Sequence, residues 1–140
     1  MNGPNTPRNT DDSLVKITSF NGDGDLQLIH GYDVTGFRIT GTRYTGPVIL
    51  LPRLTMAWTP PTNPFDVIDK DILPLISTTP PPLLIFGAGD APQAPLTTLG
   101  TTLREAGVNL ELMSTPAACR TWNVLMSEVR NAAACLYLVD

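Results

Sequence analysis

The spacing of apolar residues changes character near residue 60 of the chain. From Ser13 to Trp58, short apolar runs alternate with glycine-containing turns, a pattern typical of an antiparallel sheet or meander. Gly41 and Gly46 enclose a further expected turn. The expected strands of this half are Leu14–Phe20, Leu26–Ile29, Gly36–Thr40, Pro47–Leu51 and Leu54–Trp58.

Two proline-rich segments, Thr59–Pro64 and Thr78–Pro82, separate this half from the next. Between them, apolar residues recur at helical spacing over Phe65–Leu75, with acidic residues on the other side. This pattern predicts a short helix that ends at Pro74.

The C-terminal half alternates strand and helix patterns. Its expected elements are a strand at Leu83–Phe86, a helix over Pro95–Ala106, a strand at Val108–Met113, a helix from about Thr115 to about Asn131 and a strand over Ala132–Val139. This order predicts right-handed crossovers and a parallel sheet.

The helix boundaries carry recognisable signals. Gly107 follows the first helix at the position that favours left-handed backbone. Thr115 is the expected N-cap of the second helix, with Pro116 in its first turn. The expected buried stripe of that helix consists of Ala118, Trp122, Leu125 and Val129.

Together these elements predict an α/β fold: a three-layer single domain in which N-terminal antiparallel strands pack with a C-terminal βαβαβ parallel sheet. The domain is expected over residues 13–140, after a disordered tail at residues 1–12 that is rich in Pro, Asn, Thr and Asp. A length of 140 residues suits one domain with its own core.

Charge and hydropathy narrow the range of partners. The net charge is −4 and the nine basic residues are scattered, whereas a nucleic-acid binder concentrates basic residues on one face. No apolar run is long enough to span a bilayer, and the N-terminus lacks the pattern of a signal peptide. We therefore expect a cytoplasmic protein, monomeric or weakly dimeric, with Cys119 and Cys135 as reduced core thiols.

The chain lacks the residue sets of familiar catalysts and metal sites. It contains no Gly-x-Ser-x-Gly, Cys-x-x-Cys or His-Glu-x-x-His motif. His30 is the only histidine, and a structural role fits it better than metal binding. Cys119, near a helix amino end, is a candidate for a lowered pKa, but a buried core thiol is the simpler interpretation. We expect no cofactor and no metal.

One position could hold a small anion. The glycine-rich turn Gly87-Ala88-Gly89 follows a strand, and Arg120, Thr121 and Asn123 lie in the second helix, which follows the next strand. In an open parallel sheet such junctions gather at the carboxyl edge, where ligands commonly bind. The candidate ligand-binding residues are therefore Gly87, Gly89, Arg120, Thr121 and Asn123. A tight structural turn and a solvated helix face are the alternative interpretation.

The C-terminal half also carries a recognisable set of motifs. They are Leu84–Gly89 (LIFGAG), Gly107-Val108 and Met113–Arg130 (MSTPAACRTWNVLMSEVR), of which ACRTWNVL is the most specific. On these residues the chain resembles the small family of uncharacterised domains that includes mitochondrial complex I assembly factor three and an adipogenesis-associated mammalian protein.

The resemblance implies a three-layer α/β fold with extra β-structure, and it implies no catalytic residues. The chain departs from the family pattern at Ala88, where threonine is usual, at Ser114, where aspartate is usual, and at Trp122, where tyrosine is usual. The missing carboxylate weakens any mechanism that would need it before the second helix.

Two functions are therefore open at this point. The first is a non-catalytic protein-interaction or assembly-factor-like module, which an exposed apolar patch near the proline-rich segments would favour. The second is a small anionic-ligand binder, or an unrecognised enzyme, with its site at the carboxyl edge of the parallel strands.

Overall fold

The computed structural model describes residues 24–76, 79–90 and 96–140. The expected tail at 1–12 and the expected strand Leu14–Phe20 lie outside these residues.

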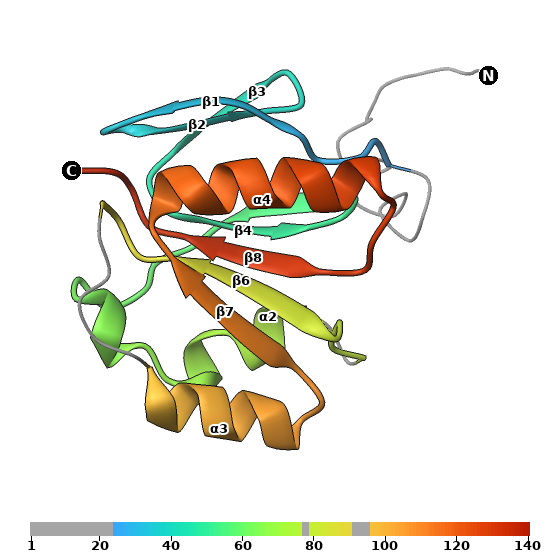
Figure 1. Ribbon diagram of the computed structural model, residues 1–140. Coiled ribbons are helices and arrows are strands. Elements are labelled where there is room, and N and C mark those ends of the chain that lie inside the picture. Colours follow the sequence, from blue (N-terminus) through green and yellow to red (C-terminus); the bar gives the residue numbers. More distant parts are fainter. Residues whose placement is uncertain (1–23, 77–78, 91–95) are drawn as a thin grey trace.

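A five-stranded sheet forms the centre of the structure, in the order β5-β4-β8-β6-β7 (Figure 1). The strands β6, β7 and β8 run parallel, while β4 is antiparallel to both β5 and β8. The expected βαβαβ unit is thus present, and two of the expected N-terminal antiparallel strands, β4 and β5, join its sheet. The bounds are β4 (Val48–Leu51), β5 (Leu54–Ala57), β6 (Leu83–Gly87), β7 (Asn109–Met113) and β8 (Ala133–Leu136).

The two crossover helices, α3 (Thr97–Glu105) and α4 (Thr115–Ser127), lie on opposite faces of this sheet (Figure 1). The chain passes from β6 to β7 in one direction and then returns across β6 to β8. Because both crossovers are right-handed, the reversal of direction places the helices on opposite sides.

A small antiparallel sheet, β1 (Ile29–Asp33), β2 (Gly36–Ile39) and β3 (Thr42–Thr45), packs on the same side as α4 (Figure 1). The expectation of a turn between Gly41 and Gly46 is wrong, because β3 occupies most of that interval. The turn is only Thr40-Gly41, where both residues have positive φ, 44° and 83°. This is the tight hairpin geometry that matches strand twist, and the polar sequence of β3 conceals the strand.

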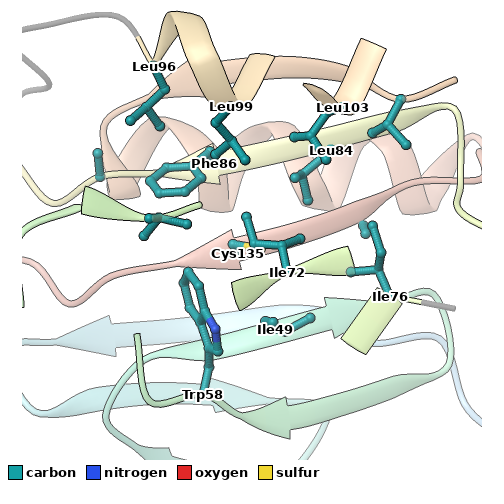
Figure 2. Close-up of a cluster of buried hydrophobic side chains, with 14 of the residues drawn as sticks. Ile49, Trp58, Ile72, Ile76, Leu84, Phe86, Leu96, Leu99, Leu103 and Cys135 are labelled. Atoms are coloured by element: carbon teal, nitrogen blue, oxygen red, sulfur yellow. The ribbon is translucent and has the colours of Figure 1, made fainter. Parts of the chain in front are cut away.

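Each face of the central sheet carries its own apolar cluster. On the α3 face, Ile49, Leu84 and Phe86 pack against Leu99 and Leu103 (Figure 2). On the α4 face, the sheet packs against both the helix and the small sheet through Phe37, Ile39, Val48, Ile85 and Trp122. Burial on two sides explains why β6 is continuously apolar.

The expected helix over Phe65–Leu75 is wrong. The chain instead forms two short 3-10 helices, η1 (Pro64–Asp66) and η2 (Asp69–Asp71), followed by the single-turn helix α2 (Leu73–Ile76). Pro74 lies in the first turn of α2, where its missing N–H is harmless, whereas a continuous helix through it would lose a hydrogen bond and clash. As a result Ile72 is buried, while Ile68 and Leu75 are exposed.

Both ends of α4 differ in detail from the prediction. The N-cap is Ser114, whose hydroxyl oxygen accepts a hydrogen bond from the Ala117 N–H at 3.3 Å, and not Thr115. At the other end, Val129 is 77% exposed and takes φ 54°, so it is not part of the buried stripe. The Arg130 N–H bonds back to the Leu125 carbonyl, so Val129 occupies the left-handed position that usually holds glycine.

Candidate functional site

The carboxyl ends of β6 and β7 form the position where a ligand crevice would be expected. The segments that follow these neighbouring strands lead to helices on opposite faces, which is the topological switch point of an open α/β sheet. The glycine-rich turn and the start of α4 therefore do meet at one edge, as the sequence predicts.

Hydrogen bonds within the protein join the glycine-rich turn to the start of α4. The Ala88 N–H bonds to the Met113 carbonyl at 3.0 Å, and the Gly89 N–H donates to the Thr115 hydroxyl at 3.0 Å. That hydroxyl donates in turn to the Tyr137 carbonyl at 2.7 Å, and the Thr115 N–H bonds to the Gly89 carbonyl at 2.6 Å. The amides that could cradle an anion are thus engaged by the protein itself.

The glycines of the turn are explained by close packing. A Cβ on Gly87 would lie 3.0–3.1 Å from Leu136 Cδ2, Ala118 Cβ and Thr115 Cα, so the bare backbone lets α4 approach the strand. Gly89 has φ +88° and lies under the Leu138 carbonyl. The last residues of the chain therefore pass over the junction.

The three helix residues of the predicted site diverge. The Asn123 amide accepts from the Ile29 N–H at 2.9 Å and donates to the Ile29 carbonyl at 2.8 Å, so it ties α4 to β1. Arg120 is exposed, and Thr121 lines a groove on the other side of the helix. The structure brings Gly87 and Gly89 together at the start of α4 and directs Arg120, Thr121 and Asn123 elsewhere. Anion binding by these residues stays a prediction.

The two cysteines are free buried thiols. Burial raises the pKa of Cys119 to about 12, and the nearby Arg120 charge only partly opposes this rise. Burial also raises the pKa of Cys135 above its usual range. The amino end of α4 therefore does not activate Cys119. No group of three metal-ligating side chains occurs among the described residues.

A groove of about 480 Å³ lies between α4 and β7, and the sequence alone does not reveal it. Its wall on the sheet side comes from alternate residues of two strands, including Ile85 and Glu111, and Thr121 of α4 faces it. Arg130 also lines the groove, and its guanidinium lies 3.7 Å from the Glu128 carboxylate. The remaining lining residues are Pro82, Leu83, Asn109, Met113 and Asn131.

A second, smaller groove of about 250 Å³ lies on the opposite face of β7, against α3. Leu110 and Leu112 line it from the strand, and Leu96, Gly100 and Arg104 line it from the helix side. The strand β7 is an edge strand of the central sheet, so both grooves border the same open edge. The alternation of side chains along β7 follows from its sequence, but its position at the edge of the sheet does not.

Comparison with known proteins establishes the family. Residues 29–137 match the family model described as a protein of unknown function, DUF498/DUF598. The chain belongs to this family. The match covers every described strand and helix, so the family assignment applies to the whole fold and not to a local motif.

Curated relatives of the chain include assembly factors. It is 35% identical over 133 residues to NADH dehydrogenase [ubiquinone] 1 alpha subcomplex assembly factor 3 of Drosophila melanogaster, covering 89% of this chain and 66% of that protein. The human protein of the same name is 31% identical, over 77% of this chain and 59% of its own length. The 13 kDa major membrane protein of Francisella tularensis is 28% identical, over 64% of this chain and 73% of that protein.

Solved structures support the same fold. An outer membrane protein from Bartonella henselae superposes with a TM-score of 0.70 at 30% identity, over 84% of this chain and 98% of that one. A Bordetella parapertussis protein gives a TM-score of 0.72 at 24% identity, over 81% and 97% of the two chains, which supports the fold alone. Within residues 24–76, 79–90 and 96–140, no helix is long and apolar enough to cross a bilayer. The cytoplasmic location stays a prediction.

Proposed function

We propose that the chain is an assembly-factor-like module that acts by binding a protein partner and not by catalysis. The observation that carries this proposal is its similarity to the Drosophila assembly factor across 89% of its length. A likeness that extends over the whole domain favours a shared mode of action more than a shared local site would.

The surface of the chain is consistent with this role. Ile68 and Leu75, between the two proline-rich segments, are 53% and 39% exposed, and Val124 on α4 is 54% exposed. Ile68 and Leu75 lie on the α3 side of the sheet and Val124 on the α4 side, so these side chains are available to a partner at separate places and do not form one patch. The thiols are buried and protonated at neutral pH, so nucleophilic catalysis by cysteine is not favoured.

The name of the Drosophila relative suggests NADH dehydrogenase as the complex that is assembled. We propose that this chain assists assembly of the same class of respiratory complex. Because it spans 66% of the length of the Drosophila protein, parts of that protein have no counterpart here.

Complementation tests the proposal directly. Drosophila cells depleted of their assembly factor 3 would express the full chain behind a mitochondrial targeting peptide, and assembled NADH dehydrogenase would be measured on native gels. The Drosophila protein itself is the positive control, and an empty vector the negative one. We expect partial recovery of the assembled complex. A chain that reaches the mitochondrial matrix at the level of the positive control without any recovery would contradict the proposal.

A further inference from the structure

Among the described residues, no strand pairs with one side of β7, so this side is the free edge of the central sheet. The Asn109 N–H bonds to the Pro82 carbonyl, and the Met113 carbonyl accepts from the Ala88 N–H, so residues 109, 111 and 113 face β6. In a parallel ladder alternate residues point the other way. The N–H and C=O groups of Leu110 and Leu112 therefore point outward from the free edge of the sheet.

The side chains of β7 line a groove on each face of the sheet beside this edge. Leu110 and Leu112 are half-buried and line the groove beside α3, whereas Glu111 is exposed and lines the groove beside α4. Gly100 of α3 lies opposite Leu110, and even a Cβ there would stay 3.8 Å from the leucine side chain. An added strand would place its alternate side chains into these two grooves, which is the arrangement used in strand addition.

The charge of Glu111 indicates which kind of strand could add to the free edge of β7. Among the described residues, its carboxylate accepts a hydrogen bond from the Asn109 amide at 3.3 Å and forms no ion pair. Arg130 lines the same groove, but its charge pairs with Glu128 at 3.7 Å. A second copy that paired Leu110 with Leu112 across a two-fold axis would set Glu111 directly opposite its own copy. Like charges in directly opposed positions destabilise a strand pair. A basic residue at that position, flanked by apolar residues facing Leu110 and Leu112, is complementary.

We propose that the free edge of β7 binds an extended segment of a protein partner whose central residues are apolar, basic and apolar. This inference rests on the proposed function, because it names the surface through which the module would hold its partner. The added strand would hydrogen-bond to the outward groups of Leu110 and Leu112 and place its basic side chain beside Glu111.

Amide hydrogen exchange of the chain alone tests whether the edge is free. The Leu110 and Leu112 amides should exchange at least about tenfold faster than the Glu111 amide, which is bonded to β6. Protection of Leu110 and Leu112 that increases with protein concentration would mean that a second copy occupies the edge, and would overturn the proposal.

Selection from a random heptapeptide library on the wild-type chain tests the occupant. We expect enriched peptides with the apolar–basic–apolar pattern, which shift the NMR signals of Leu110 and Leu112 and slow their exchange. Failure to enrich any peptide, or enrichment of peptides that bind elsewhere, would overturn the proposal.

Two variants test whether the selected peptides bind at the free edge of β7. Leu110→Pro removes an outward N–H at an edge position that tolerates proline, and should weaken peptide binding about tenfold. Glu111→Lys should weaken binding of the basic peptides about three- to tenfold at low salt. The matched control, Glu105→Lys, makes the same charge change at an exposed position of α3 outside both grooves, and should leave binding unchanged.

If the peptides bind Glu111→Lys and Glu105→Lys with equal affinity, the edge does not select its ligand by charge and the proposal fails, whether or not Leu110→Pro folds. The two levels of inference remain distinguishable. Recovery of NADH dehydrogenase without peptide binding would leave the proposed function standing and reject the edge, and peptide binding without recovery would do the reverse.

Discussion

The hydroxyl of Thr115 provides the most direct test of how the β6–α4 junction is held. Its side chain is fully buried, accepts from the Gly89 N–H at 3.0 Å and donates to the Tyr137 carbonyl at 2.7 Å. Thr115→Val replaces the hydroxyl with a methyl group of similar size and leaves both partners buried without a bond. Each unsatisfied group costs about 1–3 kcal/mol, so two cost about 2–6 kcal/mol. Burying a methyl group recovers about 1 kcal/mol, so we expect a net loss of about 1–5 kcal/mol.

Urea denaturation followed by tryptophan fluorescence measures this loss as a lower midpoint with an unchanged slope. The matched control is Thr121→Val on the same helix, where the half-buried hydroxyl makes no hydrogen bond to the described residues. The control should stay within about 0.5 kcal/mol of the wild type. If Thr115→Val is equally mild, the hydroxyl does not hold the junction and our explanation of the glycine-rich turn is wrong.

Three further predictions use the same logic. Val129→Gly should stabilise the chain by about 1 kcal/mol in urea denaturation, because glycine takes the positive φ of this exposed position without strain. Gly87→Ala should destabilise it by about 1–3 kcal/mol, since the new Cβ would lie 3.1 Å from Thr115 Cα, and an unchanged thermal midpoint would contradict this packing. Hydrogen bonds from Arg43 first, and then from Thr35, hold the pKa of Asp33 well below its usual 3.8. Its contribution to stability is therefore complete above pH 3.8 and is lost only as the pH falls further, so the NMR shift of its carboxyl carbon should still be that of an ionised group at pH 3.8.

The wrong prediction of a helix between the proline-rich segments shows that apolar spacing alone does not establish a helix. Apolar residues at helical spacing over Phe65–Leu75 indicate one helix, yet Pro74 and the packing of Ile72 and Ile76 under the sheet divide the segment into three short turns. The spacing of apolar residues in the sequence does not tell which of them will be buried in the core. In β3 the opposite error occurs, because a polar hairpin strand has no apolar alternation to detect.

The sequence by itself determined the βαβαβ unit, because continuous apolar strands, helical periodicity and the glycine at the end of α3 are local signals that agree with one another. It also placed the glycine-rich turn next to the start of α4, since topology brings the ends of neighbouring parallel strands together. Only the tertiary structure decided what those residues do. Whether an amide is free or bonded depends on partners far along the chain, as Gly89, Thr115 and Tyr137 demonstrate. The position of β7 at an edge of the sheet was likewise not predictable from the sequence, because it depends on which of the described strands pair with one another.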